Sequence, residues 1–264
     1  MQVPGVMAHA VPVRPLLNFI AGWKRVLENG LAGNVREVSV VGGGAGGVEL
    51  AFAMAARFRR EMAKGAPHVR ILTEESRILA RYPGAARRWV QSRLEAAGVG
   101  VHERSLVREV GGDFIRVGDS LTFSNHATFW VTGPAALPLL GRSGLQVDDR
   151  GFVAVNDFQQ SLSHPEVFAA GDCATRMSAA LPKSGVFAVR AGPALAANLR
   201  AAIAGTPLKA HRSRALHLAL LATGERHAVG AWGGVSFAGR WAWRWKDRID
   251  RAFIARYARP GDAG

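Results

Sequence analysis

The sequence predicts an α/β protein built on a doubly wound parallel sheet, and an alternation of strand and helix patterns carries this prediction. A short apolar strand at 36–42 leads through a glycine-rich turn into a helix at 45–64. A second strand at 68–73, a second helix at 85–97 and a third strand at 99–103 follow. Strands that alternate with amphipathic helices in this order are typical of a doubly wound half with parallel strands.

Two further elements flank this half of the fold. A helix at 15–29 is expected before it, because apolar residues recur there at helical spacing. After it, the alternating segments 114–117 and 120–123 flank the turn formed by Gly118 and Asp119. This pattern favours a hairpin in a small antiparallel meander.

The remaining chain is predicted to hold further strands and two more helices. An apolar strand at 127–133, an alternating strand at 151–161 and a buried strand at 164–172 come before a helix at 184–205. Pro193 is expected to kink that helix. Two strands at 215–223 and 227–233 and a basic helix at 239–257 complete the pattern.

The basic helix at 239–257 is amphipathic in an unusual way. Trp241, Trp245, Ile249 and Phe253 repeat every four residues on one side, and arginine and lysine crowd much of the rest. One interpretation is packing in the core or in a dimer. The other is an interfacial helix on a membrane surface, since tryptophan suits the headgroup region and arginine suits anionic lipid.

Composition narrows the class of protein. The net charge of +14 in 264 residues comes mostly from scattered arginine, so we interpret it as a solvated basic surface that attracts anionic partners. No nucleic-acid recognition motif accompanies the charge, and no specific nucleic-acid partner is expected. No apolar run reaches the roughly 18 residues of a membrane span. The expected location is therefore cytoplasmic, with a peripheral position on the inner membrane face left open.

The single cysteine, Cys173, limits the redox chemistry of the chain. One cysteine forms no intrachain disulfide and no Cys-x-x-Cys pair, which fits a reducing compartment. We expect Cys173 to be a small buried residue rather than a nucleophile. No metal site is predicted.

The strongest functional motif is the glycine loop in "VVGGGAGGVELA", residues 40–51. Gly42, Gly44 and Gly47 have GxGxxG spacing between a strand and a helix. The first glycine permits the turn, the second lets the backbone approach phosphate, and the third lets helix and strand pack closely. The positive end of the helix would face a pyrophosphate. We therefore favour dinucleotide binding over a purely structural turn.

Two acidic positions near this loop have open interpretations. At the end of the second strand Thr73 stands where a ribose-binding acid is expected, and Glu74 follows it. A carboxylate there would favour NAD over NADP, while Arg77 keeps NADP open, and the acids could equally be exposed loop residues. Glu49 lies on the first turn of the helix, where it either complements the helix dipole or contacts the nicotinamide ribose or amide.

At three motifs the sequence resembles the two-dinucleotide flavoproteins of the pyridine nucleotide-disulfide oxidoreductase superfamily, in particular type II NADH dehydrogenase-like members. "VVGGGAGGVELA" looks like their NAD loop, "FWVTG" at 129–133 like the strand that returns to the FAD domain, and "VFAAGDCA" at 167–174 like their second flavin motif. The segments 182–203 and 241–257 look most like the oxidoreductase module fused to selenide, water dikinases.

The resemblance implies FAD and NAD(P)H as cofactors and assigns residues to the flavin. Asp172 would accept hydrogen bonds from the ribityl chain, with Gly171 allowing close approach, and Gly133 would lie where the chain returns to the FAD domain. The helix that begins near Gly185 would direct its N–H groups at the flavin pyrimidine edge. Lys183, Ser184 and Val186 match the same stretch, although Lys183 could instead be a solvated loop charge.

The resemblance also implies that a first unit is missing. Family members begin with a strand, a GxGxxG turn and a helix that hold the ADP half of FAD, and no such stretch precedes Val40. We expect an N-terminally truncated flavoprotein fold with a small C-terminal α+β region. The expected parts are a connecting segment with a helix at 1–35, an NAD(P)-binding domain at 36–123, the C-terminal part of an FAD domain at 124–205, and strands with an amphipathic helix at 206–264.

The leading functional prediction is an FAD-dependent module that passes a hydride from NAD(P)H to FAD and then to an unknown electron acceptor such as a quinone. The alternative is a non-catalytic nucleotide-binding module or one part of a split or fused enzyme. Its partner would be the missing FAD-binding segment or a selenide, water dikinase domain. No acid or base is assigned, because His9, His126 and His164 lie in segments where solvent-exposed or turn roles are expected.

Overall fold

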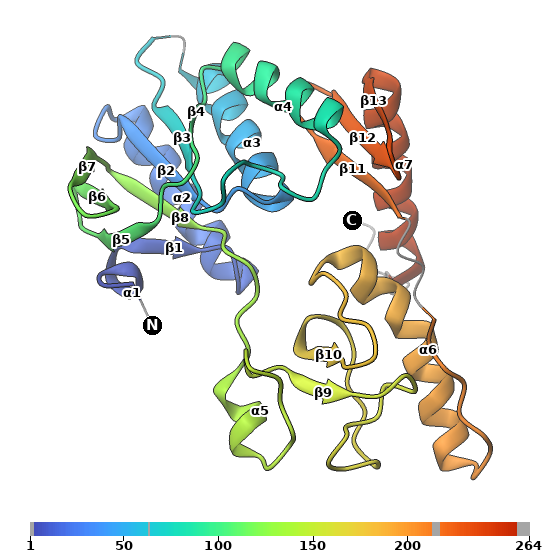
Figure 1. Ribbon diagram of the computed structural model, residues 1–264. Coiled ribbons are helices and arrows are strands. Elements are labelled where there is room, and N and C mark those ends of the chain that lie inside the picture. Colours follow the sequence, from blue (N-terminus) through green and yellow to red (C-terminus); the bar gives the residue numbers. More distant parts are fainter. Residues whose placement is uncertain (1–2, 63, 213–216, 258–264) are drawn as a thin grey trace. The chain divides into compact units, whose positions relative to one another are not determined.

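The computed structural model describes residues 3–62, 64–212 and 217–257 (Figure 1). They form two compact units. The first unit runs to Thr132 and includes the segment from Leu218 onward, and the second runs from Gly133 to His217. The four domain ranges expected from the sequence divide the chain differently and stay predictions.

The first unit contains a five-stranded parallel sheet with the order β1-β8-β2-β3-β4. Its strands are β1 (Ala10–Pro12), β8 (Ala127–Trp130), β2 (Glu37–Val41), β3 (His68–Leu72) and β4 (Gly100–His102). The helices between them are α2 (Leu16–Leu31), α3 (Ala45–Glu61) and α4 (Gly84–Ala96). The predicted alternation of strands and helices is therefore confirmed.

The core of the first unit lies where these helices meet the sheet. Val38 and Val40 of β2, Ile71 of β3 and Phe129 of β8 are fully buried. Trp23 of α2 packs between helix and sheet, with its ring centroid 5.3 Å from that of Phe58 and 6.2 Å from that of Phe129. Such aromatic contacts add to the apolar burial that fixes α2 and α3 on the sheet.

A second small sheet of the first unit is the predicted meander. Its strands β5 (Val107–Val110), β6 (Phe114–Val117) and β7 (Leu121–Ser124) pair antiparallel in chain order. The short helix α1 (Val6–His9) contacts β5. Alternate residues such as Ile115 and Val117 are buried against Val41 and Leu72, which explains the period of two in the sequence.

The C-terminal part of the first unit is a three-stranded antiparallel sheet with one helix. It consists of β11 (Leu218–Ala222), β12 (Ala228–Trp232), β13 (Val235–Gly239) and α7 (Arg240–Tyr257). Strand β13 was not predicted, and the first residues of the strand expected at 215–223 lie outside the described residues. β11 packs on α3, and β12 and β13 pack on α4.

The aromatic side of α7 does not pack into the core. Trp241, Trp245, Ile249 and Phe253 are between 41% and 53% exposed, while Ala242 is the buried residue of the helix. Phe237 stacks on Trp241 and Trp245, with centroid distances of 5.0 Å and 5.9 Å. The core interpretation of this side was wrong, because α7 turns Ala242 toward the sheet and leaves Trp241 and Trp245 about half exposed, and packing in a dimer stays a prediction. No helix in the described part of the chain is long and apolar enough to cross a membrane.

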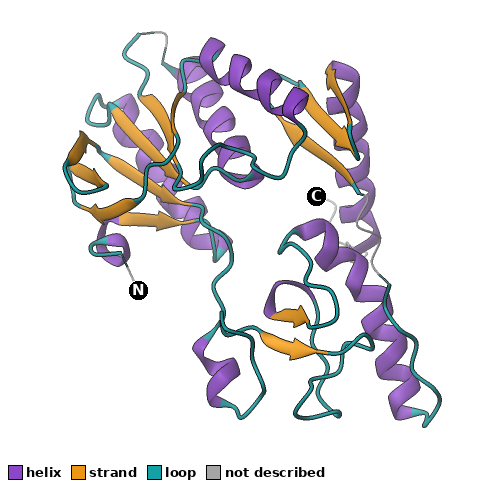
Figure 2. Ribbon diagram, in the orientation of Figure 1, coloured by secondary structure: helices purple, strands orange, loops and turns teal. Residues whose placement is uncertain are grey.

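The second unit has little sheet, as Figure 2 shows. Strands β9 (Val153–Val155) and β10 (Ala174–Arg176) pair in parallel. The unit also contains α5 (Pro138–Arg142), the 3₁₀ turn η1 (Gly171–Cys173) and α6 (Gly185–Ile203), and α6 contacts η1. Pro193 lies inside α6. The buried residues include Phe152 and Val153–Val155, with Phe187 and Ala191 from α6.

Two predictions for the second unit are corrected. The segment 164–172 is not a buried strand: Phe168 makes one antiparallel bridge to Gln160, and the Val167 N–H is used in a turn to the His164 carbonyl. Cys173 is exposed, and its thiol lies 3.2 Å from the Ala170 carbonyl oxygen. The tight turn η1 explains this exposure, because it places Cys173 at its end instead of in the core.

Candidate functional site

The glycine loop connects the end of β2 to the start of α3. Gly42 has φ +132°, and a Cβ on it would lie 2.5 Å from the Val131 carbonyl oxygen. A Cβ on Gly47 would lie 1.9 Å from the carbonyl oxygen of Gly42. No side chain fits at either position without a backbone shift, so the loop and the first turn of α3 pack as the glycine spacing predicts.

Gly44 differs from its neighbours because its free side faces open space. It is the N-cap residue of α3, and as a glycine it has no side chain that could cap the first N–H groups of the helix. A Cβ on Gly44 would meet no atom within 4 Å. The first N–H groups of a helix have no partner inside the helix, and they attract anions. The residues present therefore fit a pyrophosphate at this end of α3.

The segment after β3 forms the side of the site where an adenine ribose is expected. Thr73 is buried, and its hydroxyl accepts the Glu75 N–H at 3.3 Å. A Cβ on Gly43 would lie 2.8 Å from the Thr73 side chain, so these two residues pack directly together. Glu74, Glu75 and Arg77 are exposed. The structure thus presents both carboxylates and a guanidinium at this edge of the sheet.

Glu49 makes contacts that the sequence analysis did not foresee. Its carboxylate accepts the Ala222 N–H of β11 at 2.8 Å, and it lies 3.8 Å from Lys246 Nζ of α7. Burial raises the pKa of Glu49, against the Ala222 hydrogen bond and the Lys246 charge, which lower it. The same carboxylate and burial raise the pKa of Tyr82 to about 12, with burial the larger cause.

A pocket in the second unit lies at the start of α6. Ser184 is the N-cap of α6 and its side chain makes no capping hydrogen bond, which leaves the first N–H groups of this helix available. Four residues predicted from the sequence line the pocket: Gly171, Asp172, Lys183 and Ser184. Gln159, Arg176 and His211 line it as well and were not predicted. Its free volume of about 60 Å³ suits a chain or ring edge of a ligand rather than a whole dinucleotide.

Three predicted residues lie outside the lining of this pocket. Gly185 and Val186 belong to the first turn of α6 and are exposed. Gly133 is exposed at the first position of the second unit. None of the three is therefore brought to Asp172 by the described structure of the pocket.

Lys183 is not a solvated loop charge. Its ammonium group contacts the Ala174 carbonyl oxygen, lies 3.0 Å from Thr175 Oγ1 and sits 4.1 Å from the centre of the Phe152 ring. Burial lowers the pKa of Lys183, while the charges of Asp148 and Asp172 act in the opposite direction. The lysine thus places a fixed positive group beside Asp172, which suits an anionic or polar ligand.

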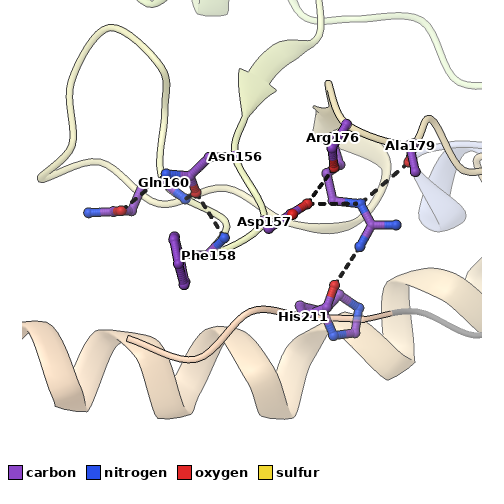
Figure 3. A network of polar contacts seen from close by, with 8 residues as sticks. Asn156, Asp157, Phe158, Gln160, Arg176, Ala179 and His211 are labelled. Carbon is purple, nitrogen blue, oxygen red and sulfur yellow. Dashed lines mark hydrogen bonds and ion pairs between the residues drawn. The ribbon is translucent and has the colours of Figure 1, made fainter. Parts of the chain in front are cut away.

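Arg176 organises the far side of the pocket (Figure 3). Its Nε lies 3.8 Å from Asp157 Oδ1 and 3.4 Å from the Ala179 carbonyl oxygen, and one of its terminal nitrogens donates to the His211 carbonyl oxygen. The His211 N–H in turn donates to the Asp157 carbonyl oxygen at 2.8 Å. This network holds the segment after α6 against β10, and burial followed by the Arg176 charge lowers the pKa of His211.

Gln159 carries a polar atom that no described protein group satisfies. Its side chain is 4% exposed, and its Nε2 donates to the Ala191 carbonyl oxygen of α6 at 3.2 Å. Its Oε1 is buried without a hydrogen-bond partner among the described residues. A buried orphan acceptor is costly unless a ligand donor or water completes it. The pocket therefore fits a ligand with a hydroxyl or N–H donor, such as a ribityl chain.

Sequence reasoning missed Gln159, Arg176 and His211. Gln159 has φ +69°, a conformation that gives no sequence signal outside glycine and asparagine. Arg176 and His211 come together only because the chain returns after α6. The alternation of polar and apolar residues at 151–161 was the one available signal, and it indicated a strand and not a site.

Comparison with known proteins identifies a family. The sequence profile described as "Pyridine nucleotide-disulphide oxidoreductase" matches residues 3–197. A "Probable NADH dehydrogenase" of Dictyostelium discoideum is 25% identical over 142 residues, which are 51% of this chain and 32% of that protein. "Demethylphylloquinone reductase NdbB" of Synechocystis sp. is 27% identical over 223 residues, 81% of this chain and 52% of that protein. The chain thus spans between a third and about half of these curated relatives.

Solved structures show the same fold. NDH2 from Plasmodium falciparum, in a complex with NADH, matches 96% of this chain and 71% of its own with a TM-score of 0.82 and 12% identity. The sulfide:quinone oxidoreductase of Aquifex aeolicus matches 96% of this chain and 65% of its own with a TM-score of 0.76 and 15% identity. At such identities the likeness concerns the fold alone.

Proposed function

We propose, from the premise that this chain belongs to the pyridine nucleotide-disulphide oxidoreductase family, that it binds NADH and FAD and passes a hydride from the first to the second. The observation that carries the proposal is the open N-terminus of α3 at Gly44, enclosed by glycines at which no Cβ fits. When bound, NADH would supply a hydride and FAD would serve as its acceptor.

In the first unit, the chain's own groups would bind the dinucleotide backbone. The N–H groups at the start of α3 would donate to the pyrophosphate, with Gly44 allowing close approach. Glu74 would accept a hydrogen bond from the adenine ribose, because it follows the buried Thr73 at the end of β3. The exposed carboxylates of Glu74 and Glu75 favour NADH over a coenzyme with an additional 2′-phosphate.

In the second unit, the pocket at α6 would hold part of the flavin. Asp172 would accept hydrogen bonds from the ribityl chain, and Gln159 Oε1 would accept another from the same group. The first turn of α6, from Gly185 and Val186, would direct its N–H groups toward the pyrimidine edge, where its dipole favours negative charge. With one cysteine in the sequence, this route uses no protein disulfide.

We propose that the electron acceptor is a quinone and that the protein binds to a membrane surface. One relative is named a demethylphylloquinone reductase, and one structural neighbour a sulfide:quinone oxidoreductase. The exposed tryptophans of α7, flanked by arginines, suit the headgroup region of an anionic membrane. The chain should co-sediment with vesicles that contain acidic lipid. In a Trp241→Ser, Trp245→Ser double variant the co-sedimenting fraction should be smaller.

The experiment for the proposed function is an anaerobic visible absorption spectrum of the purified chain after reconstitution with FAD, followed by titration with NADH. We expect the chain to retain flavin and the flavin band to bleach as NADH is added. Addition of a soluble quinone should restore the band. A colourless chain would contradict the flavin part, and a flavin that NADH does not reduce would contradict hydride transfer and favour a nucleotide-binding module without turnover.

A further inference from the structure

One basic residue of α7 faces the interior of the first unit. Arg240, Arg244, Arg248 and Arg251 are exposed, whereas the Lys246 side chain is only 24% exposed. Lys246 Nζ lies 2.9 Å from Asp250 Oδ2 on the same helix and 3.8 Å from Glu49 Oε1 on α3. Burial alone would lower the pKa of Lys246, but Asp250 and Glu49 outweigh it and raise the pKa. The ammonium group is therefore held charged between two carboxylates.

The Glu49 carboxylate that meets Lys246 lies close behind the glycine loop. Glu49 comes two residues after Gly47, on which a Cβ would meet the Gly42 carbonyl, and four residues after the first residue of α3. At a rise of about 1.5 Å per residue, its Cα is roughly 6 Å along the axis from the helix start. Its side chain is 32% exposed and is fixed by the Ala222 N–H of β11.

This position makes the charge of Glu49 relevant to an anion at the loop. A bound pyrophosphate and an unpaired Glu49 carboxylate would repel each other within the screening length of about 8–10 Å at physiological salt. The carboxylate would also offset the positive end of the α3 dipole that attracts the anion. The charged groups around Glu49 are Lys246 and Asp250 of α7, with the Tyr82 hydroxyl nearby. Lys246 is the cation of this set.

We propose that Lys246 is a positioning residue of the dinucleotide site, which pairs with the Glu49 carboxylate behind the pyrophosphate loop so that the docking of α7 sets the affinity for NADH. The proposal rests on the proposed function, because it takes the glycine loop as the NADH site. It gives α7 a role in the first unit that is independent of its exposed aromatic side, since Lys246 and the tryptophans act through different contacts.

Removal of Lys246 has a defined pH dependence. Without the ammonium group, Glu49 loses a charge that lowers its pKa, so its pKa rises further above the ordinary value. Above that pKa the unpaired carboxylate repels the pyrophosphate and NADH binding weakens. Below it the carboxyl takes up a proton, the repulsion ends and binding recovers. A loss that comes only from misfolding would not recover in this way.

The experiment titrates NADH into the full chain and follows fluorescence to obtain the Kd. The proteins compared are the wild type, Lys246→Met, Lys246→Arg and the control Arg248→Met. The control removes an exposed charge of the same helix. At about pH 8, K246M should raise the Kd about threefold to tenfold, and the defect should be smaller at about pH 6 because protonation of Glu49 increases as the pH falls. K246R should restore binding, and R248M should change the Kd less than about twofold at either pH.

A second arm measures the coupling in a Glu49→Gln background. There, K246M should weaken NADH binding no more than R248M does, because no carboxylate remains to be paired. The proposal is overturned if K246M binds NADH as the wild type does at both pH values, or if its loss is equal in the E49Q background. If the wild type itself shows no NADH binding, the proposed function fails, and this inference fails with it.

Discussion

We assign two helix N-termini to cofactors, that of α3 in the first unit and that of α6 in the second. They differ in the kind of residue that forms the ligand space. At α3 the shape comes from glycines: a Cβ on Gly47 would lie 1.9 Å from a backbone oxygen, and one on Gly44 would meet nothing. At α6 the shape comes from side chains, among them Lys183, Arg176 and Gln159. The site at α3 depends on glycines, which have no side chain, at fixed spacing along the sequence. The site at α6 depends on side chains that the fold brings together.

This difference decides how each region should respond to substitution. In the α3 region a single methyl group can disturb either the packing of the loop or the ligand space, depending on which glycine receives it. In the α6 region the replacement of a single polar side chain should weaken ligand binding with little effect on the stability of the fold.

The largest effect is expected for Gly47→Ala. The new methyl group would meet the Gly42 carbonyl, so the loop must move. We expect a loss of about 2 kcal/mol in the free energy of unfolding and a loss of NADH binding. Urea unfolding and NADH titration measure the two effects. The control Gly234→Ala places its Cβ in open space and should change neither quantity; a stable G47A variant with intact NADH binding would contradict the account.

Gly44→Ala should separate binding from folding. Its φ of −75° suits alanine and its Cβ would meet no protein atom, so stability should change by less than about 1 kcal/mol. The methyl group would occupy the space in which the pyrophosphate approaches the N–H groups, and the Kd for NADH should rise about tenfold. Calorimetric titration measures the Kd for NADH, and a thermal melt of the same sample measures stability. If G44A and G47A lost the same amount of stability and of NADH affinity, the two glycines would not differ in role.

In the second unit, Gln159→Leu should weaken flavin retention about threefold to tenfold and leave stability within about 1 kcal/mol of the wild type. The substitution removes the orphan acceptor Oε1, which would otherwise receive a ligand hydrogen bond. Flavin content after gel filtration and a thermal melt test this prediction. The matched control is Gln91→Leu at an exposed position of α4. Unchanged flavin retention in Q159L would exclude Gln159 from the site.

The smallest effect concerns the pH dependence of stability through Glu49. Its pKa in the folded chain is raised above the ordinary 4.5, chiefly by burial. The stability that this group contributes is therefore complete below its unfolded pKa and is lost as the pH rises through the folded pKa. Compared with Glu49→Gln, the wild type should become less stable as the pH rises in that window. Urea unfolding of both proteins across the window tests the sign, and the opposite trend would show a lowered pKa.

The contrast between the two regions also explains what the sequence could predict. The alternation from β2 to β4 and the loop at Gly42, Gly44 and Gly47 follow from local periodicity and spacing, whereas α1, β1 and β13 of the first unit were not predicted. The segment 164–172 was predicted as a strand from its apolar composition, but pairing depends on distant partners, and Phe168 has one bridge. The pocket residues Arg176 and His211 meet through tertiary contacts, as do Glu49 and Lys246, and no local pattern marks such pairs. The narrower resemblance to the module of selenide, water dikinases stays a prediction.

The most direct test of the account is a calorimetric titration of NADH into the wild-type chain and the Gly44→Ala variant under identical conditions. We expect one NADH site in the wild type and a Kd about tenfold higher in the variant, with melting temperatures that differ by no more than about 4 °C. Absence of binding in the wild type, or equal affinity in both proteins, would contradict the claim that the N-terminus of α3 is the dinucleotide site.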